Sequence, residues 1–246
     1  MPRQQQQAAR PVRRRSYDQF CAAARALDSV GDRWTLLIVR ELLAGPRRYT
    51  DLHADLPGVS TDVLASRLKD MEQSGLAVRR RLPPPAAASV YELTGRGRGL
   101  LPVLAALAEW GAPALDERRP TDAVRAHWFA LPLLRALEGL THAGVVEVHL
   151  DEGEFHVRTG RGPGAGSERR AADGEVGDVS ERRAADGEVE DVYGYGPAER
   201  PDVRIALDAE LCLALGRGEA TVLEAVEDGR IEVVGEGPLA AELRGE

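Results

Sequence analysis

Apolar side chains recur at helical spacing along much of the first half of this chain. Residues 21–30 and 34–44 carry apolar stripes that return every three or four positions, which predicts two amphipathic helices. A Gly-Pro pair ends the second of them, and a short helix is expected at residues 49–54. A tight Leu-Pro-Gly-Val turn then leads into a longer helix over residues 60–74.

The stretch that follows changes from helical to alternating periodicity. Residues 78–82 and 90–93 alternate as strands do, and the proline-rich residues 83–89 between them predict the tip of a hairpin. A helix rich in Leu and Ala is expected over residues 98–110. A helix preceded by a tight turn and followed by a two-stranded wing predicts a winged helix-turn-helix, a shape that fits the DNA major groove.

The second half mixes the two periodicities. A helix is expected over residues 124–142, and residues 145–150 and 154–158 predict a hairpin that turns at Asp-Glu-Gly. Further along, strands are expected at 203–207 and 231–234, and helices at 209–215, 220–227 and 239–244. The pattern indicates a separate domain with both helices and strands.

One segment of the second half is repeated. Residues 167–179 (SERRAADGEVGDV) recur as residues 180–192 (SERRAADGEVEDV), with Gly177 in the first copy replaced by Glu190 in the second. Two polar copies of 13 residues are too short, and contain too few apolar residues, to form a solenoid. We interpret residues 160–192 as a flexible surface loop lengthened by tandem duplication.

The charge of the chain is divided unequally. Residues 1–120 carry 19 Lys and Arg against 13 Asp and Glu, a net of +6, whereas residues 121–246 carry 13 against 27, a net of −14. A basic half joined to an acidic one indicates a nucleic-acid-binding part linked to a part with another task. We predict an α+β protein with a disordered basic arm at 1–16, a winged helix-turn-helix domain at 17–116 and a second domain at 121–246.

A helix that reads DNA packs one face inward and turns small or polar side chains outward. Leu64, Leu68 and Met71 form the packed stripe of residues 60–74, so the opposite face is available to the groove. Basic side chains before this helix and in the wing would reach phosphates. The residues predicted to contact DNA are Arg47, Arg48, Ser60, Thr61, Asp62, Ala65, Ser66, Arg67, Lys69, Arg79, Arg80 and Arg81. A solvated amphipathic helix beside a basic strand is the alternative, and the ordered series of elements favours DNA.

These residues resemble the HxlR-type family of bacterial winged-helix regulators. The matching stretches are Cys21, residues 26–43, 45–49, 56–60, 64–68, 75–76 and 91–94, and Gly97. The resemblance implies a homodimer on a palindromic double-stranded operator, joined through the helix at Cys21 and the helix at 100–110. It also makes Cys21 a candidate redox sensor, with a small residue packed at the dimer helix as the alternative. The wing tip, Pro83 to Pro85, departs from the acidic or polar tip of the family, so the resemblance does not extend to minor-groove contact by this tip.

The second half resembles the sterol-carrier-protein-like fold, on residues 200–208, 213–220 and 229–239. The resemblance implies a C-terminal α/β domain of five strands and several helices around an apolar cavity, which suits a hydrophobic ligand. The implied lining is Trp128, Phe129, Leu133, Leu137, Phe155, Leu207, Leu211, Leu215 and Val222. The alternative is that these side chains fill an ordinary core.

No constellation in the sequence supports an enzyme. The glycine-rich residues 160–166 lack the Lys-Ser/Thr of a phosphate loop, and Glu154 and His156 share a strand face without a third ligand or nucleophile. We therefore assign no catalytic residue, metal site or cofactor. No apolar run reaches the roughly 18 residues of a membrane span, so no membrane partner is expected. We therefore expect a cytoplasmic protein.

The sequence thus predicts a DNA-binding transcriptional regulator, with a dimeric repressor favoured, whose C-terminal domain senses a hydrophobic small molecule. Two alternatives remain open. One is a carrier of lipid or another hydrophobic ligand that uses the winged helix only to dimerise. The other is a DNA-binding regulator with no small-molecule effector.

Overall fold

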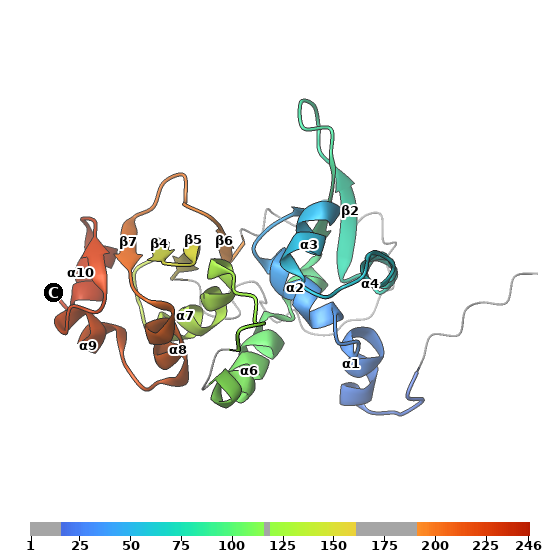
Figure 1. Ribbon diagram of the computed structural model, residues 1–246, viewed down its shortest axis with the longest axis horizontal. Helices are drawn as coiled ribbons and strands as arrows, with labels where there is room; N and C mark the ends of the chain where they lie inside the picture. The colour runs from blue at the N-terminus through green and yellow to red at the C-terminus, as the bar shows by residue number, and fades with distance from the viewer. Residues whose placement is uncertain (1–15, 116–118, 161–190) are drawn as a thin grey trace, which may run out of the picture.

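The computed structural model describes residues 16–115, 119–160 and 191–246 (Figure 1). The first of these ranges folds as a bundle of short helices with a three-stranded sheet. Its elements are α1 (Ala22–Val30), α2 (Thr35–Leu43), β1 (Arg47–Arg48), α3 (Tyr49–Asp55), α4 (Thr61–Gln73), β2 (Ala77–Arg81), β3 (Ser89–Leu93), α5 (Gly95–Arg98), α6 (Leu101–Gly111) and the 3-10 helix η1 (Ala112–Leu115). This order confirms the winged helix-turn-helix predicted from the periodicity.

A serine cap begins helix α4, and a glycine follows its end. The Ser60 side chain accepts a hydrogen bond from the backbone N–H of Val63, which caps the first turn. Gly75 follows the helix with a φ of +69°, a left-handed conformation in which a glycine costs least. The buried stripe of Leu64, Leu68 and Met71 packs into the core with Ile38 and Leu42 of α2, which confirms the predicted inward face.

The wing is an antiparallel pair with a third strand added. The sheet order is β1-β3-β2, and Arg79 of β2 lies opposite Tyr91 of β3. The short strand β1 pairs Arg47 with Tyr91 and Arg48 with Val90. No strand was predicted at these two arginines, because two residues are too few to show an alternation.

The second half is built on a five-stranded sheet in the order β6-β5-β4-β7-β8. All pairs in it are antiparallel except β4 with β7, which run parallel. The strands are β4 (Gly144–Leu150), β5 (Gly153–Thr159), β6 (Tyr193–Tyr195), β7 (Val203–Ala206) and β8 (Glu232–Val234). The helices are the 3-10 helix η2 (Ala126–Phe129), α7 (Ala130–Ala136), α8 (Ala209–Arg217), α9 (Val222–Glu227) and α10 (Pro238–Arg244).

One expectation for the second half was wrong in extent, and one strand was not predicted. The helix predicted over 124–142 is only η2 and α7, and it ends at Ala136. Leu137 closes the helix with a tight turn, and the backbone N–H groups of Thr141 and His142 donate to the Glu242 carboxylate instead of continuing it. Strand β6 was missed because its Tyr-Gly-Tyr sequence resembles a turn more than a strand.

The wing tip and the helices α1 and α6 lie on opposite sides of the molecule (Figure 1). Figure 1 shows the wing tip beyond β2 rising on one side of the molecule, with α1 and α6 on the opposite side. Helix α6 lies between the winged helix and the second half, where it contacts α7. In the described part of the chain no helix is long and apolar enough to cross a membrane. Residues 1–15 of the predicted arm and most of the repeat lie outside the described residues.

Candidate DNA-binding surface and the junction behind it

The outward face of α4 carries small and polar side chains. Thr61, Asp62, Ala65, Ser66 and Lys69 are all exposed on it, as the periodicity predicted. A face without bulky apolar groups can approach base edges closely. The Tyr49 hydroxyl donates to the carbonyl of Thr61 at 2.7 Å and so fixes the start of α4 against α3.

The wing presents arginines next to this face. Arg79, Arg80 and Arg81 are all exposed on the edge strand β2. The Nε of Arg80 lies 3.1 Å from a carboxylate oxygen of Glu92 on β3. Because the Arg80 side chain is exposed, water screens this pair and a phosphate could displace it. Arg79 sits over the Tyr91 ring, with its guanidinium 6.0 Å from the ring centre.

Other predicted contacts are already engaged within the protein. Arg67 pairs with Asp70 at 2.9 Å and with Asp32 at 3.5 Å, which holds it along the helix. Arg47 is half-buried, pairs with Asp55, and stacks 3.8 Å over the Tyr195 ring from the second half. Arg47 therefore links the winged helix to the second half, whereas Arg48 beside it is exposed.

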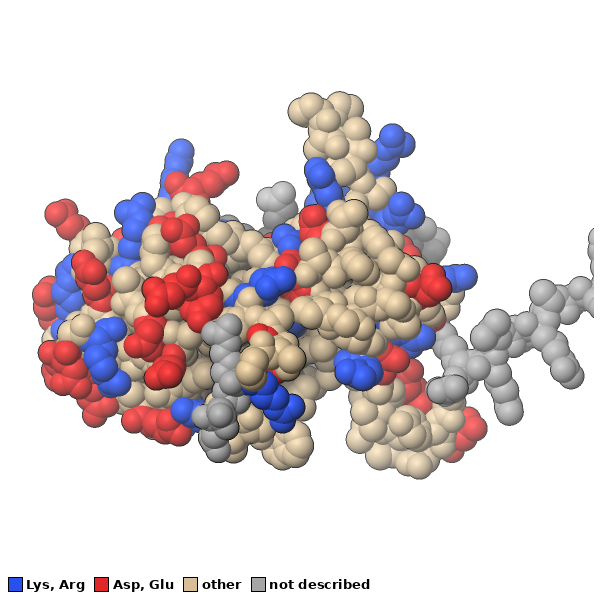
Figure 2. Space-filling view, in the orientation of Figure 1, with Lys and Arg blue, Asp and Glu red and all other residues tan. Residues whose placement is uncertain are grey.

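Charge separates over the visible face of the molecule. Figure 2 shows blue side chains flanking the wing, whereas red side chains gather on the second half. Among the described residues, 121–160 and 191–246 carry 8 Lys and Arg against 19 Asp and Glu, whereas 16–115 carry 12 against 11, so the positive charge of the winged helix is concentrated locally at the wing. A positive surface around the wing would attract DNA, and the acidic half would stay away from it.

Helices α1 and α6 leave large apolar side chains uncovered. Trp110 of α6 is 82% exposed, and Leu107 on the same helix and Leu27 of α1 are about half exposed. Phe20, just before α1, is fully exposed. A monomer seldom leaves several such side chains uncovered on one side of the molecule, so these surfaces favour contact with another protein chain (Figure 1).

Behind the candidate DNA-binding surface, one buried carboxylate joins the two halves. Glu41 lies in α2 and has no exposed surface. Its Oε1 accepts hydrogen bonds from the Arg40 Nε at 2.8 Å and the Trp128 indole N–H at 2.9 Å. Its Oε2 lies 2.7 Å from the Nε2 of His127 and 3.0 Å from the Tyr195 hydroxyl. Because an ionised carboxylate only accepts, all of these groups donate to it.

The electrostatics of the junction favour the charged form of Glu41. Burial by itself raises the pKa of Glu41, but the hydrogen bond from His127 and the positive charge of Arg40 outweigh it, so the pKa lies below its usual value. The hydroxyl of Tyr195 also donates to the Glu41 carbonyl at 2.8 Å, and that of Tyr193 donates to the Arg40 carbonyl at 2.6 Å. The helix that supports α4 is therefore tied to β6 and η2.

Further contacts extend the junction on either side. The Nε of Arg125 lies 3.3 Å from the Asp55 carboxylate of α3, and the Arg98 guanidinium lies 3.6 Å from Asp191. Burial raises the pKa of Asp191. The sequence did not single out this junction, although a glutamate inside the apolar run TLLIVRELL was a signal for it, since a buried acid needs partners.

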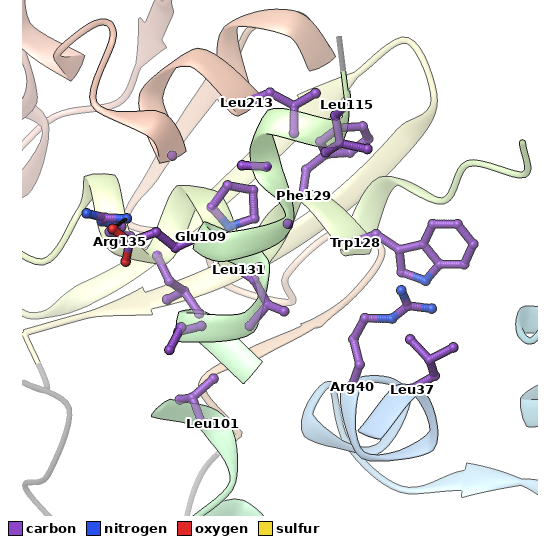
Figure 3. A pocket seen from close by; sticks show the side chains of 18 of the residues that line it. Leu37, Arg40, Leu101, Glu109, Leu115, Trp128, Phe129, Leu131, Arg135 and Leu213 are labelled. Carbon is purple, nitrogen blue, oxygen red and sulfur yellow. Dashed lines mark ion pairs between the residues drawn. The ribbon is translucent and has the colours of Figure 1, made fainter. Parts of the chain in front are cut away.

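The residues predicted to line a ligand cavity fall into two groups. Leu133, Phe155, Leu211 and Leu215 are buried in the core, as is Leu207, and Val222 packs at its margin. Trp128, Phe129 and Leu137 instead line a cavity of about 1560 Å³. That cavity lies between the winged helix and the second half, with walls from α2, α6, η1, α7 and α8 (Figure 3).

The two cysteines differ in their surroundings. Cys21 precedes α1 and is exposed, whereas Cys212 of α8 is fully buried. Burial raises the pKa of the Cys212 thiol to about 12, so it is protonated at neutral pH.

A helix-turn-helix with an outward polar α4 and an arginine-bearing wing is the structure of a DNA-binding transcriptional regulator. Comparison with known proteins leads to the same class. The model of the HxlR-like helix-turn-helix family matches residues 29–119, and the chain belongs to this family.

Two curated relatives from Bacillus subtilis illustrate the similarity. The HTH-type transcriptional regulator YvaP is 36% identical over 92 residues, which are 37% of this chain and 85% of that protein. The HTH-type transcriptional regulator YodB is 34% identical over 85 residues, 35% of this chain and 76% of the relative. The solved structure of reduced YodB matches with 29% identity and a TM-score of 0.36, over 41% of this chain and 100% of that one.

Proposed function

We propose that this regulator binds a palindromic operator as a homodimer and represses transcription. The observation that carries the proposal is the exposed polar face of α4 beside the arginines of β2. In this arrangement α4 enters the major groove while Arg80 and Arg81 reach phosphates of the flanking backbone.

The homodimer is supported by the apolar surfaces of α1 and α6. Leu27, Leu107 and Trp110 would be covered by the same surfaces of a second copy, as a twofold interface requires. Because these helices lie on the side of the molecule opposite to the wing tip, a partner there would leave both wings free (Figure 1).

The second half would act as a sensor for a hydrophobic small molecule, with a sterol-carrier-like domain as its framework. The buried junction at Glu41 supports this role, because any shift of η2 or β6 moves the partners of α2. A ligand that binds one arrangement of the two halves better than another would shift the population of dimers that fit both half-sites.

The test is the salt dependence of binding to the DNA upstream of the protein's own gene. Lys69→Ala and Arg81→Ala should each lower the slope of log K against log salt by about 0.9, the value for one lost phosphate contact. Both side chains are exposed and neither forms an ion pair with another described residue, so the loss would come from DNA. Arg200→Ala removes an exposed arginine of the second half and serves as the matched control.

The same assay separates the alternatives. Unchanged slopes in both variants would mean that α4 and β2 do not face DNA. Absence of any salt-sensitive DNA affinity in the wild type would favour a carrier of hydrophobic ligands. Leu107→Glu should convert the dimer to a monomer in sedimentation and weaken operator binding, and a Leu107→Glu protein that remains dimeric would place the interface elsewhere.

A further inference from the structure

Helix α6 has three faces with different surroundings. Leu104 is buried in the core of the winged helix. Val103, Leu107 and Trp110, spaced four and three residues apart, are exposed to solvent. The third face includes Leu101, Ala105 and Ala108, spaced four and three residues apart, and it lines the 1560 Å³ cavity. Ala112, the first residue of η1, continues this wall. The helix proposed to form the dimer is therefore also a wall of the cavity.

The opposite walls come from the second half and from α2. In Figure 3, Phe129, Leu115 and Leu213 gather on one side of the cavity, while Trp128 stands beside Arg40. The guanidinium of Arg40 lies 4.2 Å from the centre of the Trp128 ring. Trp128 and Arg40 are the same residues that donate to Glu41, so the cavity borders directly on the buried junction.

The charged groups of the wall leave no excess of either sign. Four arginines and four acids occur among the described lining residues. Arg135 pairs with Glu109 across the wall at 2.8 Å. A charged ligand would lose its hydration in the cavity and would find no unpaired charge of opposite sign in return. Its transfer from water would therefore cost free energy. An uncharged one would be favoured by the apolar wall.

We propose that this cavity between α6 and the second half is the effector site, and that it takes a bulky, uncharged, hydrophobic molecule. The inference rests on the sensor role proposed above and places the site at the boundary of the two halves instead of inside the five-stranded sheet, where Phe155 and Leu211 already fill the core. The volume exceeds the range of roughly 300–1,000 Å³ typical of sites for drug-sized molecules, so a large ring system or long chain fits it.

Occupancy of this site would act on both elements that determine DNA binding. A ligand against Ala105 and Ala108 presses on the inner side of the helix whose outer side carries Leu107 and Trp110. The same ligand contacts Trp128, and through its indole the carboxylate of Glu41 in α2. The spacing of the two α4 helices in a dimer would thereby depend on what the cavity holds.

The test uses the full-length protein and a matched pair of fluorescent probes. N-phenyl-1-naphthylamine is uncharged, and 8-anilinonaphthalene-1-sulfonate has the same ring skeleton with a negative charge. We expect saturable binding of the uncharged probe, at least tenfold tighter than that of the sulfonate. Equal affinity for both would overturn the uncharged class of ligand, and absence of saturable binding would overturn the site.

Two substitutions fill the cavity from its opposite walls. Ala108→Trp narrows it from α6, and Leu213→Trp narrows it from α8. Each should weaken binding of the uncharged probe at least tenfold. The controls Ala209→Trp and Leu223→Trp make the same changes at positions that do not line the cavity, and they should bind the probe as the wild type does. Thermal unfolding shows that each variant is folded.

The outcomes distinguish this proposal from the proposed function. Normal probe binding by Ala108→Trp would place the site elsewhere, whatever the DNA assay shows. A change of oligomeric state in both filled variants would mean that a second copy occupies the cavity, and would also overturn the proposal. Loss of probe binding in both, with operator affinity unaffected by the probe in the wild type, would leave the site standing and contradict the sensor role.

Discussion

The Oε2 of Glu41 and the Nε2 of His127 lie 2.7 Å apart, although 86 positions separate the two residues in the sequence. The hydrogen bond joins α2, on which α4 packs, to η2 at the start of the second half. Glu41 also receives the Trp128 and Tyr195 donors, so three groups from the second half meet on one buried carboxylate. Such a group is stable only while its donors stay in place, because an unpaired buried charge is costly.

Glu41→Gln should therefore lower the free energy of unfolding by about 3 kcal/mol. The amide keeps the shape of the side chain but turns an N–H group toward donors that need an acceptor. Urea denaturation at pH 7 would measure the loss. Glu138→Gln, which removes the same charge from an exposed site, should stay within about 0.5 kcal/mol of the wild type. Equal stability of both variants would show that the junction contributes nothing.

The same residue predicts a loss of stability in acid. The pKa of Glu41 in the folded protein lies below its ordinary value of 4.5, so the unfolded chain takes up a proton at higher pH than the folded one does. The stabilisation is complete above pH 4.5 and is lost as the pH falls through the lower, folded pKa. The difference in stability between the wild type and Glu41→Gln should thus narrow below pH 4.5. A constant difference from pH 7 to pH 3 would contradict the assignment.

The winged helix could be predicted because its signals are local. The stripe of Leu64, Leu68 and Met71 fixes which face of α4 points inward, and Gly75 marks where the helix ends. The alternation in β2 and β3 likewise depends only on neighbouring residues. Such features need no knowledge of the rest of the chain.

The junction and the cavity could not be predicted because they are made by residues far apart in sequence. Nothing near Glu41 shows that His127 and Tyr195 will donate to it, and nothing near Arg47 shows that it will stack on Tyr195. The expected ligand lining was drawn from one half alone, so it included core residues such as Phe155 and missed the wall that α6 provides.

The two thiols should react at very different rates. The raised pKa of Cys212, about 12, and its burial leave almost no accessible thiolate at pH 8, whereas Cys21 is exposed. Ellman's reagent should label one thiol per chain rapidly and the second only in denaturant. Cys21→Ser should abolish the fast phase. A fast phase that survives in Cys21→Ser would mean that α8 opens readily in the native state.

Removal of one repeat copy should leave the fold intact. Deleting residues 180–192 places Asp178 and Val179 directly before Tyr193, where Asp191 and Val192 now stand. Asp191 lies 3.6 Å from the Arg98 guanidinium, and the carbonyl of Val192 accepts a hydrogen bond from the Arg158 N–H at 2.9 Å. Because both copies end in Asp-Val, the shortened chain can restore these contacts.

The deletion of residues 180–192 is expected to change the free energy of unfolding only slightly, and the shorter loop should make the change stabilising. Closing a loop costs only about 0.6 kcal/mol more for each doubling of its length, so the deletion should stabilise the protein by no more than about 1 kcal/mol. A deletion of equal length shifted by one residue, 181–193, is the matched control. It replaces Tyr193 by Ser180 and removes a fully buried side chain whose hydroxyl donates to the Arg40 carbonyl. That variant should lose roughly 3–5 kcal/mol. If deletion of 180–192 is as damaging as the shifted deletion, the second copy itself is part of the packed structure.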